Sequence, residues 1–471
     1  DHRDLHSFPT RRSSDLLPVG DEATDHAIAV PLLNRSDVLV GVMLLICPEA
    51  SDPAQISFIE ALSGSSAVSL ESRELIHAQK VLFESFIQLI AGAIDAKSPY
   101  TGGHCARVPE LTKMLARAAC DETSGPYASF SLSDEEWEAV HVAAWLHDCG
   151  KVTTPEYVVD KATKLETLYD RIHEVRMRFE VLKRDAEIAC LKAIVAGEPE
   201  ARARNELARA LAGLDDDYGF IAGCNEGGEF MAPEKLDRLK KIAARTWTRT
   251  LDDRIGISHD EKERKARTPA SGLPVVEPLL ADRPEHVFER AARDRMPADN
   301  QWGFRMDVPE ALYNKGELYN LGVARGTLSN EERYKINEHI VQTLIMLTQL
   351  PFPKHLRNVP EIAAGHHEKM DGTGYPRRLT RDEMSPVARM MAIADIFEAL
   401  TAVDRPYKKG KTLSEAITIM SVMKKDQHID PELFDLFLRS GVYRDYAERF
   451  MKPEQIDTVD VPACLAGPPA A

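Results

Sequence analysis

The chain has 471 residues, more than one hydrophobic core usually supports, so two or three domains are expected. Its formal net charge of −16 argues against a binder of nucleic-acid polymers, because nonspecific binding of that kind depends on clustered lysine and arginine. The longest apolar run, residues 38–47, is too short for a membrane span, so no membrane insertion is predicted. The seven scattered cysteines form no CxxC pair, which favours a reducing compartment and a cytoplasmic location.

The N-terminal region begins with sixteen residues, DHRDLHSFPTRRSSDL, that show neither helical nor strand periodicity. They look like a translated sequencing adapter, so residues 1–16 are excluded from fold reasoning as non-native; the alternative is a disordered native tail. Two apolar runs follow, at 27–33 and 38–46, and the polar NRSD between them predicts a β-hairpin. A helix is expected to begin near Pro53.

The order of hairpin and helix, with PLLNRSDVLVGVMLLI and SSAVSLESRELI, resembles the C-terminal half of a GAF sensor domain. This resemblance implies a small, partial α+β sensor domain at 17–80. A linking helix is expected at 81–97, because Leu82, Phe86 and Leu89 keep one apolar stripe at spacings of four and three. Such a helix either pairs with a second copy in a homodimer or packs on the next domain.

A first group of metal-binding residue types follows the linking helix. His104 stands at a helix start, after the turn KSPYTGG. A second helix begins near Ser133 and carries His147 on its apolar face. Asp148 follows directly, and an aspartate can bridge two metal ions because each of its oxygens can bind one. Lys151 could then meet a phosphate oxygen, although a core histidine satisfied by hydrogen bonds is the alternative reading of each imidazole.

A second group lies in the C-terminal half. A capped helix starting near 329 places His339 beside an apolar stripe. His366 and His367 precede the loop EKMDGTGYP, and neutral imidazoles are common ligands of transition metals. Asp395 lies in an apolar helix, where a buried unpaired carboxylate would be costly and a bound cation would remove that cost. An aspartate that pairs with an arginine or caps a helix is the alternative.

The segments HDCGK and HHEKMDGTGYP, with TGGHCARV, EERYKINEHI and ARMMAIADIFEALTAVDRPYKKGK in the same order, resemble the HD-GYP family. This family is a branch of the HD phosphohydrolases that hydrolyses cyclic di-GMP. The resemblance covers 85–168 and 321–445 and implies a mainly α fold, an all-helical HD bundle. The HD-GYP phosphohydrolase domain is therefore placed at 98–168 and 321–445.

The remaining segments are an insertion at 169–320 and a C-terminal tail at 446–471. The insertion is rich in charged sequence of helical character, such as 176–192 and 233–248, and contains no recognisable chemical motif. We expect a helical subdomain that covers one side of the site or forms an oligomer interface.

The resemblance implies a ligand set of five histidines and two aspartates. One ion is assigned to His104, His147, Asp148 and Asp395, and Asp148 bridges to a second ion held by His339, His366 and His367. Nitrogen and oxygen ligands without thiolate suit iron or manganese, with zinc and nickel still open. Some family members bind a third ion through a glutamate four residues before the first histidine; Tyr100 stands there, which favours two divalent ions. Cys105 and Cys149 adjoin ligands but are interpreted as packing residues, because neighbours on a helix point about 100° apart.

The implied mechanism is attack by a hydroxide that bridges two metal ions, with Asp148 and Lys151 as catalytic residues. Substrate binding is carried over from the family to Lys151, Gly374, Tyr375, Pro376, Arg405 and Lys408. A solvated basic loop is the alternative for Arg405 and Lys408. The Gly374–Pro376 loop also contacts GGDEF cyclase domains in the family, and Glu368 and Asp371 are expected to orient ligands.

Three functions follow as hypotheses. The first is a cyclic di-GMP phosphodiesterase of bacterial second-messenger signalling, which yields pGpG and, by a further cleavage, GMP. The second is an HD phosphohydrolase acting on another nucleotide, because the insertion could reshape the pocket. The third is a catalytically silent signalling module that binds cyclic di-GMP or a partner. The complete ligand set favours an enzyme, with a GGDEF-domain protein and a second copy of the chain as expected partners.

Overall fold

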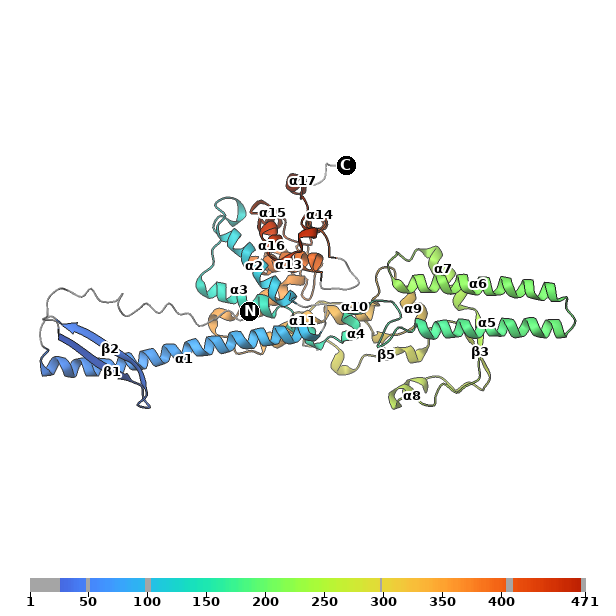
Figure 1. Cartoon of the computed structure of the whole chain (residues 1–471), viewed down its shortest axis with the longest axis horizontal. Coiled ribbons are helices and arrows are strands. Elements are labelled where there is room, and N and C mark those ends of the chain that lie inside the picture. The colour runs from blue at the N-terminus through green and yellow to red at the C-terminus, as the bar shows by residue number, and fades with distance from the viewer. Residues whose placement is uncertain (1–25, 48–50, 98–102, 297–298, 404–409, 467–471) are drawn as a thin grey trace. The chain divides into compact units, whose positions relative to one another are not determined.

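The computed structural model describes residues 26–47, 51–97, 103–296, 299–403 and 410–466 (Figure 1). The chain forms two compact units, residues 1–86 and 87–471. The long helix α1 (Pro53–Lys97) is continuous through the boundary between them. None of the described helices combines the length and the hydrophobicity that a membrane crossing requires.

The first unit contains the predicted hairpin. Strands β1 (His26–Leu33) and β2 (Leu39–Cys47) pair antiparallel, and the side chains of Val30 and Leu32 are buried. Asn34 in the connecting turn donates a hydrogen bond to Glu71 of α1 at 2.8 Å. The predicted order of hairpin and helix is confirmed, and a side-chain hydrogen bond fastens the turn to the helix.

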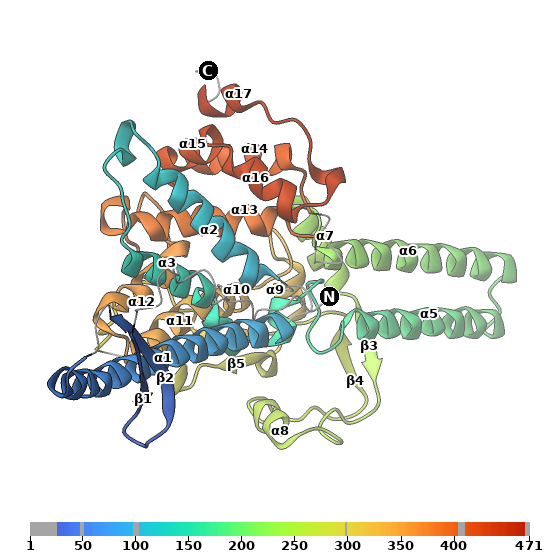
Figure 2. The same ribbon diagram turned by 60° about the vertical axis from the view of Figure 1, so that its left-hand side comes forward.

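The second unit contains a helical bundle, as predicted (Figures 1 and 2). Its helices are α2 (His104–Cys120), α3 (Asp134–Leu146), α4 (Glu156–Val159), α10 (Asn330–Asn337), α11 (His339–Thr348), α12 (Val359–Ala364), α13 (Pro386–Thr401), α14 (Leu413–Lys425), α15 (Pro431–Arg439) and α16 (Val442–Phe450). Two 3-10 helices, η3 (Cys149–Thr153) and η7 (Gly365–His367), join them at the site. Capping boxes start α3 at Ser133 and α10 at Ser329, where the sequence predicts helix starts.

The bundle continues past residue 445, where the sequence analysis placed its end. Tyr446 lies in α16 and is buried, with its ring centre 5.6 Å from that of Phe397 in α13. The predicted boundary is therefore too early, because the aromatic face of α16 completes the core. A short helix, α17 (Val461–Ala466), follows.

The insertion opens with two long helices, α5 (Ile172–Val195) and α6 (Glu200–Glu226), which lie side by side in both views (Figures 1 and 2). Helices α7 (Pro233–Ala243), α8 (His259–Lys265) and α9 (Glu317–Leu321) follow. Two strand pairs lie between them, β3 (Thr246–Arg249) with β4 (Val275–Pro278) and β5 (Val287–Glu289) with β6 (Ala311–Asn314).

The prediction of a wholly helical insertion is therefore wrong for its second half. The helix expected over 233–248 ends at Ala243, and Thr246, Trp247 and Thr248 belong to β3. Side chains of β-branched and aromatic residues favour the extended backbone, and pairing with β4 satisfies that preference.

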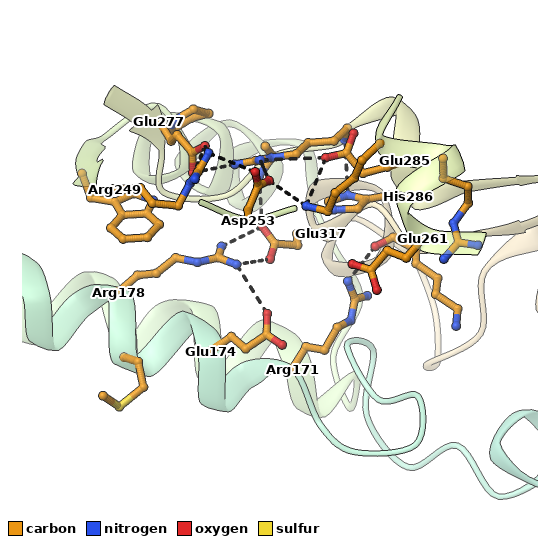
Figure 3. A pocket seen from close by; sticks show the side chains of 18 of the residues that line it. Arg171, Glu174, Arg178, Arg249, Asp253, Glu261, Glu277, Glu285, His286 and Glu317 are labelled. Carbon is orange, nitrogen blue, oxygen red and sulfur yellow. Dashed lines mark hydrogen bonds and ion pairs between the residues drawn. The ribbon is translucent and has the colours of Figure 1, made fainter. Parts of the chain in front are cut away.

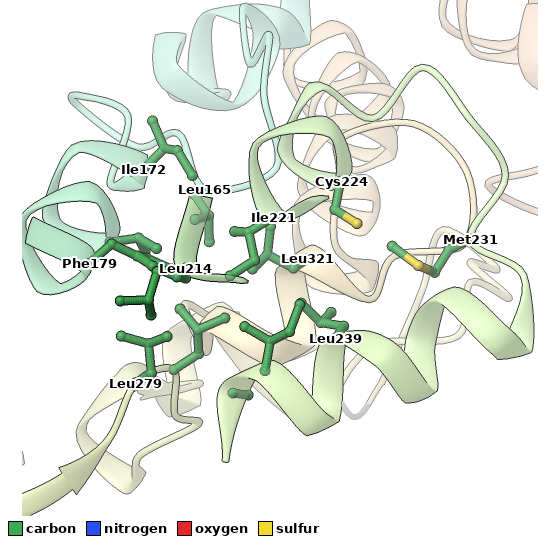
Figure 4. Packing of buried hydrophobic residues seen from close by; sticks show 14 residues of the cluster. Leu165, Ile172, Phe179, Leu214, Ile221, Cys224, Met231, Leu239, Leu279 and Leu321 are labelled. Carbon is green, nitrogen blue, oxygen red and sulfur yellow. The ribbon is translucent and has the colours of Figure 1, made fainter. Parts of the chain in front are cut away.

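The insertion has a hydrophobic core of its own (Figure 4). Phe179 of α5, Ile221 of α6 and Leu239 of α7 are buried in it together with Leu165 and Leu321, which flank the insertion in the chain. Because both flanking segments enter this core, the insertion is packed onto the bundle at its base.

A buried ion pair lies at this junction. The Lys161 ammonium lies 2.7 Å from the Glu332 carboxylate of α10. The neighbouring Lys164 ammonium donates to the carbonyl oxygens of Leu321 and Val323 at 2.9 and 2.8 Å. Both lysines are buried, so their charged ends are held by partners rather than by water.

Candidate metal centre

Seven side chains from separate elements of the bundle meet at one place. They form two sets whose ligand atoms lie within 4.8 Å of one another, His104 with His147, Asp148 and Asp395, and His339 with His366 and His367. The first set comes from α2, the C-terminal end of α3 and α13, and the second from the start of α11 and from η7. The structure thus brings together all seven residues that the sequence analysis named as ligands, in the same two groups.

Asp148 lies between the two sets. Its Oδ2 atom is 3.3 Å from His104 Nε2 and 3.2 Å from His147 Nε2. Its Oδ1 atom is 3.2 Å from His339 Nε2, in the other set. Each carboxylate oxygen therefore faces a different group, which is the arrangement that a bridging ligand requires.

Backbone carbonyls fix the tautomers of three histidines. The Nδ1 atoms of His147, His339 and His366 lie 2.7, 2.6 and 2.6 Å from the carbonyl oxygens of the residues three positions earlier. A nitrogen that donates to a carbonyl must carry the hydrogen, so in the neutral ring the Nε2 atom presents a lone pair to the site.

Several donor atoms at this site lack the hydrogen-bond partners that buried polar groups normally have. Across the described part of the chain, buried side-chain atoms without a hydrogen-bond partner include His147 Nε2, His366 Nε2 and Asp148 Oδ1. Burial and the neighbouring His147 imidazole lower the pKa of His366 to about 4. Burial and the neighbouring His366 imidazole hold the pKa of His367 well below its usual range. Converging imidazole nitrogens and carboxylate oxygens, three of them without a hydrogen-bond partner in the described structure, fit divalent metal ions.

Glu398 is a member of the site that the sequence analysis missed. One of its oxygens accepts a short hydrogen bond from His104 Nδ1, and the other lies 2.6 Å from Arg107 Nη2. Burial acts against a charged His104, but its hydrogen bonds with Asp148, Asp395 and Glu398 outweigh it and raise the pKa well above its usual value. A sequence signal existed, because Glu398 follows Asp395 by three residues and so lies one turn along the same side of α13.

Lys151 reaches the centre, as predicted. Its ammonium donates to Asp148 Oδ2 at 2.5 Å. Burial alone would lower the pKa of Lys151, but the charges of Asp148 and Asp395 outweigh it and raise this pKa. The site therefore keeps the positive charge of Lys151 beside its carboxylates.

Gly150 allows the two halves of the centre to approach each other. A Cβ atom at this position would overlap the carbonyl oxygen of His339 and lie 2.8 Å from Thr343 Oγ1. The Gly150 N–H donates to that hydroxyl at 2.9 Å. A side chain here would push η3 away from α11, and with it Asp148 from His339.

The loop after the histidine pair contacts the centre through Tyr375. Its ring stacks on His367 with ring centres 4.9 Å apart, and its N–H donates to the His367 carbonyl. A Cβ atom on Gly374 would overlap the backbone of Glu368, so only glycine allows the loop to fold back this closely. The next carbonyl, of Pro376, accepts a hydrogen bond at 2.8 Å from the N–H of Arg305, in the insertion.

The prediction that Glu368 and Asp371 orient metal ligands is wrong. Glu368 is buried and accepts hydrogen bonds from the N–H groups of Arg377 and Leu379 at 2.7 and 2.9 Å. Asp371 accepts from the N–H and the hydroxyl of Thr373. Both carboxylates shape the loop itself, because they satisfy its backbone donors.

The interpretation of the two adjoining cysteines as packing residues agrees with their environment. Cys105 and Cys149 are both buried. Burial raises the pKa of the Cys149 thiol to about 12, and burial with the charge of Asp148 raises that of Cys105 further. Both are protonated thiols at neutral pH, and metal ligation requires the thiolate. Arg405, Lys408 and Tyr100 lie outside the described residues.

A cavity of about 520 Å³ adjoins the loop. It is lined by residues 306–309 of the insertion, by Asn330 and Tyr334 of α10, and by Gly374 and Tyr375. Nearby, Phe304 packs against Ile340 of α11 in a small buried cluster. The end of the insertion therefore forms one wall beside the predicted substrate loop.

Comparison with a protein-family model supports the HD-domain resemblance that the sequence motifs indicate. Residues 274–433 match the HD domain family. The matched range contains His339, His366, His367 and Asp395.

The chain is also similar to curated bacterial phosphodiesterases. It is 34% identical over 143 residues to a cyclic di-GMP phosphodiesterase of Pseudomonas aeruginosa, covering 30% of each chain. It is 32% identical over 148 residues to a 3′3′-cGAMP-specific phosphodiesterase of Vibrio cholerae, covering 30% of this chain and 33% of the relative. A cyclic di-GMP phosphodiesterase of Thermotoga maritima is 34% identical over 124 residues, or 25% and 33% of the two chains. The chain thus spans about a third of the length of these relatives.

Proposed function

We propose that this chain is a metal-dependent phosphodiesterase that hydrolyses cyclic di-GMP to pGpG, with GMP as a further product. The observation that carries the proposal is the position of Asp148, with one carboxylate oxygen toward each of two histidine-containing sets. Similarity to proteins named as cyclic di-GMP phosphodiesterases supports the substrate.

In this proposal, His104, His147, Asp148 and Asp395 hold one divalent ion, and Asp148, His339, His366 and His367 hold the second. When bound, two such ions lower the pKa of water and stabilise negative charge on phosphodiester oxygens. The donor set of nitrogen and oxygen atoms favours iron or manganese.

The other residues of the site position groups and balance charge. Glu398 orients the His104 ring and keeps its Nε2 atom directed at the two aspartates. The Lys151 ammonium, which lies beside Asp148, would neutralise a substrate phosphate oxygen at the site. Tyr375 holds His367 by stacking, and Gly374 and Pro376 shape the surface on which the substrate lies. Substrate contacts by Arg405 and Lys408 rest on the family resemblance.

A second candidate substrate is 3′3′-cGAMP. Two relatives from Vibrio cholerae, 32% and 39% identical over 148 and 112 residues, are named as specific for that dinucleotide. The two substrates differ in one purine base, so residues beside the substrate loop would discriminate between them. Met306 and Asp307 of the insertion line the cavity next to that loop, which supports them as candidates for this discrimination.

The test uses the full chain, purified and loaded anaerobically with iron or manganese. Cyclic di-GMP and 3′3′-cGAMP are incubated separately with it, and the products are separated by chromatography. Conversion of cyclic di-GMP to pGpG is expected. Faster cleavage of 3′3′-cGAMP would favour the second substrate. Binding without cleavage of either, with every metal, would instead identify a silent signalling module.

The partners remain part of the proposal. Leu75, Leu82 and Phe86 of α1 are 65%, 58% and 55% exposed. Their spacings of seven and four residues form the apolar stripe of a coiled-coil contact, which supports a homodimer through this helix. The GGDEF-domain partner and the GAF-like fragment rest on the family resemblance.

A further inference from the structure

The insertion contains a cavity of about 660 Å³, a size typical of small-molecule sites (Figure 3). Its walls come from α5, α8 and the β3–β4 pair, and from residues near the start of α9. The seven candidate metal ligands are not among the residues that line it.

Many of the charged groups that line this cavity neutralise one another. The Arg178 guanidinium lies 2.9 Å from Glu317, and Arg249 lies 2.9 Å from Glu277 (Figure 3). Lys265 lies 2.7 Å from Asp253. These pairs build a rigid polar wall and leave little net charge on it.

Three lining cations are different. No carboxylate within the described ranges lies at ion-pair distance from Arg171, Arg264 or Lys315. Arg171 donates only to backbone carbonyls, those of Leu165 and Lys315, at 3.2 and 2.7 Å. The buried Nε atom of Arg264 has no hydrogen-bond partner in the described structure. This part of the cavity therefore carries positive charge that no carboxylate of the described residues neutralises at ion-pair distance, and Glu317 and Glu332 act on Arg171 only from farther away.

Phe288 holds two of these cations in place. The Arg264 guanidinium carbon is 4.2 Å from the centre of its ring, and the Lys315 ammonium is 4.8 Å from it. The Lys315 ammonium also lies 5.5 Å from the ring centre of Tyr157. Aromatic faces position a cation but do not cancel its charge. Burial and the charge of Arg171 lower the pKa of Lys315, so an anion placed among these groups would relieve an existing repulsion.

Two further lining groups suit a planar polar ring. Trp247 of β3 lines the cavity with a half-buried indole, which offers a face for stacking. The Glu261 carboxylate also lines it and has no ion-pair partner in the described part of the chain. It can accept hydrogen bonds from amino or ring N–H groups.

We propose that this cavity binds a small ligand that joins a phosphate group to a flat ring, the chemistry of a purine nucleoside monophosphate. Arg171, Arg264 and Lys315 bind the phosphate, since guanidinium and ammonium groups form short, charge-assisted hydrogen bonds with phosphate oxygens. Trp247 and Glu261 receive the ring. This site is separate from the metal centre and is independent of the function proposed for it.

The test is a calorimetric titration of the full chain with GMP and with AMP, without any cyclic dinucleotide. Lys315→Met removes the charge but keeps an unbranched side chain against Phe288 and Tyr157. Lys262→Met is the matched control, because Lys262 is exposed on α8 and does not line the cavity. Wild type and Lys262→Met should bind at least one nucleotide equally, and Lys315→Met should bind it about tenfold more weakly or worse.

Two further arms keep the proposal falsifiable. Arg264→Gln should also weaken nucleotide binding. It replaces Lys315→Met as the test variant if circular dichroism shows that Lys315→Met does not fold. Ribose 5-phosphate should bind more weakly than the nucleotide, and equal binding would remove the ring from the proposal. No binding of either nucleotide to wild type at about 1 mM, or equal affinity in wild type and both cavity variants, would overturn it.

Discussion

Asp148 Oδ1 lies 3.2 Å from His339 Nε2, although the insertion separates the two residues in the chain. His339 Nδ1 donates to the carbonyl of Ile336, so in the neutral ring the nitrogen that faces Asp148 carries a lone pair. Two buried acceptors at this distance repel each other, and a cation bound by both would remove the repulsion. Assembly of the two bundle halves and formation of the proposed metal site are thus the same event.

Replacement of Asp148 tests its bridging role. Asp148→Ala removes both oxygens that face the two sets, so we expect loss of bound metal and loss of hydrolysis. Metal analysis and the chromatographic assay measure the two effects. Asp382→Ala is the control, because Asp382 is exposed and follows the loop after the histidine pair in the chain. This variant should keep its bound metal and its hydrolytic activity. An active Asp148→Ala protein would refute the bridging role.

Gly150→Ala tests the close approach of η3 and α11. The added methyl group would overlap the His339 carbonyl. We therefore expect the free energy of unfolding to fall by about 1–3 kcal/mol and the metal content to be lower. Thermal unfolding and metal analysis are the measurements. Gly213→Ala in α6 is the matched control, where a Cβ atom meets open space and should stabilise the helix by about 0.5–1 kcal/mol. Similar behaviour of the two variants would contradict the packing argument.

Glu398→Gln tests the orientation of His104. The amide keeps the size of the side chain but removes the negative charge beside His104 and Arg107. We expect metal affinity to fall by about 10–100-fold with the fold retained, as for other groups that orient a metal-binding histidine. Competition with a chromogenic chelator measures it. Glu110→Gln, at an exposed position of α2, should leave the affinity unchanged.

Removal of metal should lower the stability of the bundle. A ligand that binds only the folded state stabilises it by RT ln(1 + [L]/Kd), about 2.7 kcal/mol when its concentration is 100 times Kd. We therefore expect a chelator to reduce the Tm of the wild type and to have no effect on Asp148→Ala. Differential scanning calorimetry is the measurement. An equal chelator effect on both proteins would place the stabilising metal elsewhere.

The Arg178–Glu317 pair predicts acid sensitivity of the insertion. Burial would raise the pKa of Glu317, but its hydrogen bond with Arg178 outweighs it, so the folded pKa lies below the usual value. The stabilisation that ionised Glu317 contributes is complete above its pKa in the unfolded chain, about 4.3. It is lost as the pH falls through the lower pKa of Glu317 in the folded protein. Glu317→Gln should lower the free energy of unfolding by about 1.5–3 kcal/mol at pH 7, and by progressively less below pH 4.

Denaturant unfolding at several pH values checks this prediction. Glu234→Gln, at an exposed position of α7, should unfold like the wild type throughout. A difference between wild type and Glu317→Gln that stays constant from neutral to acid pH would show that the charge of Glu317 does not contribute.

The sequence by itself determined the secondary structure around the site and which residues are candidate metal ligands. Capping boxes at Ser133 and Ser329 are local, since the interacting residues are three positions apart, and the helices begin where these patterns predict. The histidines and aspartates could be named for a similar reason, because few other residue types bind metal ions and the motifs that hold them are short and ordered.

Only the tertiary structure decided which oxygen of Asp148 faces which set, that Glu398 supports His104, and that Glu368 serves the loop. These relationships depend on how distant helices pack, and no spacing along the chain encodes a distance between them. The insertion shows the same limit. Its charged sequence predicted a helical subdomain, but pairing of β3 with β4 and the close approach of two cations to Phe288 arise only when separate segments meet.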